Sequence, residues 1–152
     1  MKKTIAVILA MLAGPTVAAP KEVCAKDICV SNGWARATPP GADNAAVYFS
    51  VVNKGRTADS LISASSNITA NAMVHRTVVT GGIAHMEMGG PVEVNAGGHV
   101  SFAPIGYHLM LEGLKQPVTE GKVISVTLDF AGAGKLTFPV PVLGVTAAGP
   151  PR

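Results

Sequence analysis

Residues 123–130 have the sequence Val-Ile-Ser-Val-Thr-Leu-Asp-Phe, in which apolar and polar side chains alternate. Successive side chains of a β-strand point to opposite faces, so this alternation predicts a strand with one apolar face. That face would carry Ile124, Val126, Leu128 and Phe130. Residues 136–142 repeat the pattern, with Pro139 and Pro141 on the other face. Proline has no N–H to donate, so this second strand should lie at an edge or pair on one side only.

The chain upstream of this hairpin has the same character, with short alternating runs separated by turns rich in Gly, Pro and Asn. Further strands are predicted at residues 28–37, 45–53, 60–65, 72–80, 83–88, 92–95, 100–103 and 108–112. So many short strands with closely spaced turns are typical of an all-β Greek-key sandwich. Residues 20–152 are expected to form this single domain, which is long enough for one hydrophobic core.

The N-terminal residues 1–19 have the layout of a secretory signal peptide. Lys2 and Lys3 precede an uncharged apolar run at residues 4–13, and small residues follow. The run is too short to span a bilayer, so we expect an exported protein that is soluble after cleavage. Without the two lysines, 10 basic side chains (12 − 2) face 9 acidic ones. No basic cluster remains that could form a nucleic-acid-binding surface.

Cys24 and Cys29 are the only two cysteines of the chain. In an exported protein, a pair separated by four residues can form a structural disulfide across a hairpin turn. The alternative is a thiol metal site or a redox pair. A redox pair usually has two intervening residues, and no third cysteine is available for a thiolate cage. The sequence therefore favours the disulfide.

The segment His108-Leu109-Met110-Leu111-Glu112 contains the most informative chemistry. In a strand, Leu109 and Leu111 point to the core, so Met110 lies with His108 on the opposite, polar face. A methionine in that position is unusual for core packing. Side chains two residues apart on one face are close enough to bind the same ion.

A thioether combined with an imidazole indicates a particular metal. Zn(II), Mg(II) and Ca(II) rarely take thioether ligands, whereas the soft ion Cu(I) does. Further ligands are expected in the hairpin around Gly81 and Gly82, which contains Met73, His75, His85, Met86 and Met88. Alternation puts Met88 on the same face as Met86, while His85 points away. Singly, each of these residues could be a surface histidine or a core methionine.

The spacing of four residues resembles a known family. Ten residues separate His75 from Met86, twenty-one separate Met86 from His108, and one separates His108 from Met110. This matches the His-x10-Met-x21-His-x-Met motif of the PCu(A)C-type periplasmic copper chaperones. Surrounding segments are similar as well: Trp34–Ala37, Ala46–Phe49, Gly106–Leu111 and Leu114–Lys115. The resemblance extends over about residues 28–142.

The resemblance implies a cupredoxin-like β-sandwich that binds Cu(I) through His75, Met86, His108 and Met110 in a shallow site near the surface. It also implies a periplasmic protein that delivers copper for assembly of the CuA centre in cytochrome c oxidase subunit II, alongside Sco-type proteins. Some relatives carry a C-terminal extension rich in His and Met. Residues 143–152 contain neither residue, so a second copper site is not expected at that end.

The sequence leaves three other functions open. A copper storage or resistance protein would use the same ligands. A cupredoxin-like electron carrier would need a Cys thiolate with two histidines, and both cysteines lie far upstream of the His/Met residues. A metal-free adhesion or interaction domain would use the fold alone. An enzyme is not expected, because no nucleophile–base set, phosphate-binding loop or suitably spaced carboxylate pair is present.

Overall fold

The computed structural model describes residues 21–151, which form eleven β-strands; no helix is found in this range. The expected signal peptide at residues 1–19 lies outside the described residues. The strands are β1 (Glu22–Ala25), β2 (Ile28–Arg36), β3 (Asn44–Asn53), β4 (Asp59–Ser66), β5 (Asn71–Thr80), β6 (Ile83–Met88), β7 (Val92–Val94), β8 (His99–Phe102), β9 (Tyr107–Glu112), β10 (Val123–Phe130) and β11 (Gly134–Leu143). The predicted all-β class is confirmed. Within the described residues there is no helical segment of the length and hydropathy that crossing a membrane requires.

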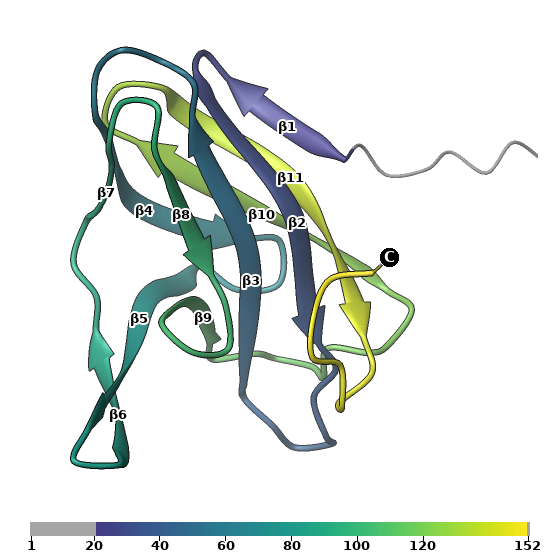
Figure 1. Ribbon diagram of the computed structural model, residues 1–152. Coiled ribbons are helices and arrows are strands. Elements are labelled where there is room, and N and C mark those ends of the chain that lie inside the picture. Colours follow the sequence, from purple (N-terminus) through teal and green to yellow (C-terminus); the bar gives the residue numbers. More distant parts are fainter. Residues whose placement is uncertain (1–20, 152) are drawn as a thin grey trace, which may run out of the picture.

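The strands follow one hydrogen-bonded path in the order β6-β5-β9-β8-β3-β2-β11-β10-β4-β7, with β1 paired to β2. An extra pairing of β4 with β5 brings distant parts of this path together. Strands β2, β3 and β8 form one layer, and β4 and β10 lie behind it (Figure 1). The β5–β6 hairpin extends away from the two layers (Figure 1). The fold is a sandwich whose one projecting arm carries several of the predicted ligands.

The core lies between the layers and follows the predicted alternation. On β10 the buried side chains are Ile124, Val126, Leu128 and Phe130, and on β11 they are Leu136, Phe138, Val140 and Val142. Strand β11 pairs with β10 from Gly134 to Pro141, and with β2 only at Val142 and Leu143. The stretch that contains Pro139 and Pro141 therefore pairs on one side only, as the missing N–H groups predict.

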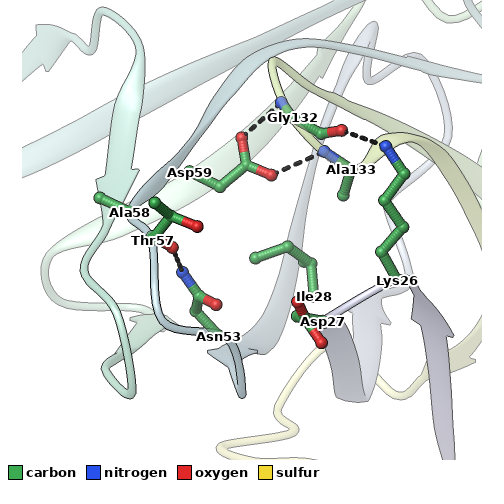
Figure 2. Close-up of a pocket in the computed structure, with 9 residues that line it drawn as sticks. All are labelled: Lys26, Asp27, Ile28, Asn53, Thr57, Ala58, Asp59, Gly132 and Ala133. Atoms are coloured by element: carbon green, nitrogen blue, oxygen red, sulfur yellow. Dashed lines mark hydrogen bonds between the residues drawn. The ribbon is translucent and has the colours of Figure 1, made fainter.

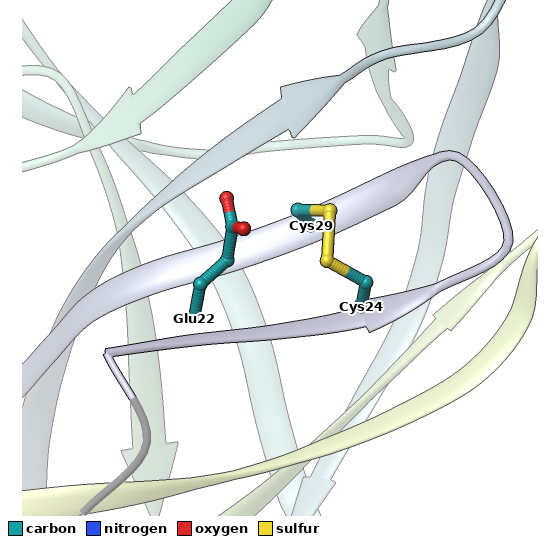
Figure 3. A group of neighbouring side chains, drawn as sticks. All are labelled: Glu22, Cys24 and Cys29. Atoms are coloured by element: carbon teal, nitrogen blue, oxygen red, sulfur yellow. A yellow bond between two sulfur atoms is a disulfide. The ribbon is translucent and has the colours of Figure 1, made fainter.

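Cys24 and Cys29 lie directly opposite each other in the β1–β2 hairpin and form a disulfide (Figure 3). The structural disulfide favoured by the sequence is confirmed, although β1 itself was not predicted as a strand. The carboxylate of Glu22 lies beside the two sulfur atoms (Figure 3). Since both sulfurs are consumed in the disulfide, these three residues offer no thiolate to a metal ion.

Candidate metal centre

Strand β9 lies between β5 and β3, and its inward residues fix the direction of the predicted ligands. Leu109 and Leu111 are 0% exposed in the core. Their burial turns His108 and Met110 to the opposite face of β9. The antiparallel register with β5 places His75 directly opposite His108, and Met73 directly opposite Met110. Directly opposite residues point to the same face of a sheet, so two histidines and two methionines meet there.

The neighbouring strand β6 adds its methionines to the same face. Its register places Met88 opposite His75, and Met86 opposite Thr77. His85 directly precedes Met86 and points to the other face, as alternation predicted. We call the resulting surface the His/Met face. It consists of Met73, His75, Met86, Met88, His108, Met110 and Glu112.

The side chains of His75 and Met86 already have the spacing of two ligands of one ion. The Nδ1 atom of His75 lies 3.3 Å from the Sδ atom of Met86. Nitrogen and sulfur ligands about 2.0 and 2.3 Å from a tetrahedral metal lie about 3.5 Å apart. A thioether is a weak hydrogen-bond acceptor, so hydrogen bonding gives little reason for this contact. The pair fits a soft metal ion.

His108 is held in a form that suits metal binding. Its side chain is 4% exposed, and its Nδ1 atom lies 3.3 Å from the carbonyl oxygen of Gly106. A donated Nδ1–H leaves a lone pair on Nε2, and this Nε2 is buried without a hydrogen-bond partner. Burial lowers the pKa of His108 below its ordinary value; the Gly106 contact opposes this effect, and the nearby His75 adds to it. The neutral imidazole that a metal requires is therefore favoured.

Exposure varies strongly across the His/Met face. Met86 and Met88 on the outer strand are 58% and 75% exposed, whereas Met110 is half-buried. The sequence placed His108 on a polar, outward side, but the structure buries it. The reason is non-local: β5 covers one side of β9, and the Gly106 turn folds against the imidazole. The face is closed at β9 and open to solvent at β6.

Glu112 also contacts the candidate ligands, and sequence reasoning gave it no role. Its Oε1 atom lies 3.7 Å from Nε2 of His75, and this Nε2 is buried without a hydrogen-bond partner. The period-two pattern did place Glu112 on the face of His108 and Met110. Its proximity to His75 follows only from the pairing of β5 with β9.

A polar cavity of about 180 Å³ lies elsewhere, against the loop after β10 (Figure 2). The carboxylate of Asp59 accepts hydrogen bonds from the backbone N–H groups of Gly132 and Ala133, both at 2.7 Å. Lys26 donates to the carbonyl oxygen of Gly132. Burial alone raises the pKa of Asp59, but the backbone N–H groups of Gly132, Ser60 and Ala133 and the charge of Lys26 outweigh it and lower the pKa. These contacts join the start of β4 and the β1–β2 turn to the β10–β11 turn.

Solved structures share this fold. The apo PCuAC domain of PmoF2 superposes with a TM-score of 0.71 at 24% identity, covering 84% of this chain and 98% of that one. The solution structure of CuI-DR1885 from Deinococcus radiodurans gives a TM-score of 0.59 at 28% identity, covering 73% of this chain and 74% of that one. These likenesses confirm the predicted cupredoxin-like β-sandwich.

Sequence comparison leads to one family. The "Putative lipoprotein Lxx21020" of Leifsonia xyli subsp. xyli (strain CTCB07) is 32% identical over 151 residues, which cover 95% of this chain and 90% of the relative. The family model described as "Putative lipoprotein LpqE-like" matches residues 28–142, from the start of β2 almost to the end of β11. The chain belongs to the LpqE-like family, and its domain has the fold of PCuAC domains.

Proposed function

We propose that this protein is a copper chaperone that binds one Cu(I) ion through His75, Met86, His108 and Met110. One observation carries the proposal. An imidazole nitrogen and a thioether sulfur, from different strands, lie 3.3 Å apart beside a second, buried imidazole with an unpartnered nitrogen. Two structural neighbours support it: a copper-bound PCuAC domain of PmoF2 and a Cu(I) form of DR1885.

The chemistry of these four side chains fits a soft, monovalent cargo. Two neutral imidazoles and two thioethers bring no negative charge to the ion, which suits Cu(I) better than a divalent hard ion. The lowered pKa of His108 keeps its imidazole neutral and available at physiological pH. Leu109 and Leu111 anchor β9 in the core, so the ligands on its other face are held by a rigid strand.

The exposure of Met86 supports transfer over permanent storage. A ligand that is 58% exposed on a projecting hairpin can be replaced by a ligand of an acceptor protein. An electron carrier is disfavoured, because blue-copper sites need a Cys thiolate and both cysteines are paired in the disulfide. We therefore propose a binding and delivery role without enzymatic activity.

We further propose that the protein acts after export to the periplasm. A disulfide and the apolar segment at residues 4–13 are both typical of exported proteins. The names of the family and of its relative, which both describe lipoproteins, support export. The motif resemblance supports delivery of copper to the CuA centre of cytochrome c oxidase subunit II, with Sco-type proteins as further partners.

The test is a competitive Cu(I) titration of the exported protein, with X-ray absorption at the copper edge. We expect one Cu(I) per chain and mixed nitrogen and sulfur neighbours. Transfer is then measured by mixing the loaded protein with purified oxidase subunit II domains and following copper by separation of the two proteins. A spectrum with only nitrogen and oxygen neighbours, or an absence of Cu(I) binding, would contradict the proposed function.

A further inference from the structure

We propose that Glu112 is a positioning residue for copper: its carboxylate accepts the Nε2–H of His75, so that His75 presents Nδ1 to the metal. The inference rests on the proposed function, because it names the donor atom of one proposed ligand. It concerns a side chain that lies outside the four-residue motif.

The two nitrogens of His75 face different partners. Nδ1 lies 3.3 Å from the sulfur of Met86, and Nε2 lies 3.7 Å from Oε1 of Glu112. The 3.7 Å separation is slightly longer than a hydrogen bond. The Glu112 side chain is 34% exposed and has several rotatable bonds, so a small torsional change closes the gap.

The position of the proton follows from the strength of the two acceptors. A neutral imidazole carries one N–H, which goes to the nitrogen with the better acceptor. A carboxylate is a strong, charged acceptor, whereas a thioether is a weak one. With the proton on Nδ1 instead, the lone pair of a buried Nε2 would face a negative carboxylate. The Nε2–H form of His75 is therefore favoured.

The sheet register explains why Glu112 can reach His75. The pair His75–His108 and the pair Asn71–Glu112 are separated along β5 and β9 by the pair Met73–Met110. All of these side chains share one face of the sheet. The Glu112 side chain therefore reaches His75 across the position of the Met73–Met110 pair. The side chain of His75 is only 12% exposed, so water competes weakly for its Nε2.

The two proposed histidine ligands then use opposite nitrogens. His108 directs Nδ1 toward the carbonyl oxygen of Gly106 and keeps the lone pair on Nε2. His75 directs Nε2 toward Glu112 and keeps the lone pair on Nδ1, beside the sulfur of Met86. Partners of this kind fix the tautomer and orientation of histidine ligands at metal sites, and losing them typically lowers metal affinity about 10–100-fold.

The test uses long-range ¹H–¹⁵N NMR of the ¹⁵N-labelled copper-free chain at pH 8, well above the ordinary histidine pKa of about 6.5. We expect His75 in the Nε2–H form, with an Nε2–H signal protected from exchange with water. Glu112→Gln keeps an acceptor oxygen and should keep that signal. Glu112→Leu should lose it and bind Cu(I) about 10-fold more weakly, while Glu112→Gln falls between Glu112→Leu and the unmodified chain.

Glu87→Leu is the matched control, because Glu87 is exposed on β6, lies opposite Arg76 in the β5–β6 register and points away from the His/Met face. It removes the same charge and should change neither the His75 signal nor the affinity. In the Cu(I)-loaded chain, the ¹⁵N shift of His75 should change at Nδ1. Coordination through Nε2, or equal affinity of Glu112→Leu and the unmodified chain, would overturn the proposal. The spectrum of the copper-free chain tests the Glu112–His75 contact even if no Cu(I) binds. A failure of this proposal can therefore be distinguished from a failure of the proposed copper-binding function.

Discussion

The Nδ1 atom of His75 lies 3.3 Å from the sulfur of Met86, although these residues are not opposite each other in the β5–β6 hairpin. The register places Met88 opposite His75 and Thr77 opposite Met86. The contact is therefore diagonal, a distance that long side chains can bridge. Met86 turns toward the imidazole, whereas Met88 is the most exposed methionine of the described chain.

This geometry predicts different roles for the two methionines of β6. Met86→Leu should lower Cu(I) affinity about 10-fold or more, because a sulfur ligand is lost. Met88→Leu should lower it much less. Both residues are exposed, so both variants should keep the thermal stability of the unmodified chain. Competitive Cu(I) titrations measure the difference, and a larger loss in Met88→Leu would exchange the roles of the two residues.

On β9, copper binding and folding should separate between neighbouring residues. Met110→Leu preserves volume and should cost less than about 1.5 kcal/mol in stability. Its Cu(I) affinity should fall about 10-fold or more. Leu109→Ala creates a cavity in the core and should cost about 2–5 kcal/mol while its ligand atoms remain in place. Thermal melts and titrations of both variants test this; unchanged affinity in Met110→Leu would make the methionine a packing residue.

His108 should make the stability of the copper-free protein depend on pH. Its pKa is lowered in the folded state, so the unfolded chain binds more protons between that value and about 6.5. The stability that the neutral, buried His108 contributes is fully present above pH about 6.5. It is lost as the pH falls through that window. Urea unfolding at pH 7.5 and pH 5 measures the change. The free energy of unfolding should fall less between these two pH values in His108→Leu than in the unmodified chain. Equal pH dependence in both proteins would contradict the burial effect.

Asp59 should act in the same direction at lower pH. Its pKa is lowered from 3.8, so its contribution is present above that value and is lost as pH falls through the folded-state pKa. Asp59→Ala leaves the N–H groups of Gly132 and Ala133 without their acceptor and should cost about 1–3 kcal/mol at pH 7. Glu93→Ala, at an exposed site on neighbouring β7, is the control in urea unfolding. An equal loss of unfolding free energy in Asp59→Ala and Glu93→Ala would contradict the stabilising role of the Asp59 carboxylate.

The disulfide should affect stability and leave copper binding intact. Replacing Cys24 and Cys29 by Ser reopens a small loop and should cost about 2 kcal/mol. The β1–β2 hairpin lies on the side of the sandwich away from the β5–β6 arm (Figure 1). Cu(I) stoichiometry should therefore remain one per chain. Loss of copper binding in a folded double variant would assign the cysteines a direct role.

The sequence alone determined the local features of this protein. Alternation predicted β6 and β10 with their observed bounds and placed Leu109 and Leu111 in the core. It also put Met86 and Met88 on one face, because the side-chain period of a strand is a local property of the backbone. The spacing of the two cysteines was enough to favour their disulfide, since a hairpin turn is also local.

Only the tertiary structure decided how the strands combine. The pairing of β5 with β9 places His75 opposite His108 and brings Glu112 toward His75 across many intervening residues. It also buries His108, which alternation had assigned to a polar face. Register is set by contacts between segments distant in sequence, and a shift by one residue would turn every ligand to the other face. The local pattern identified the residues that could bind copper, and the packing of β5, β6 and β9 determined which of their atoms meet.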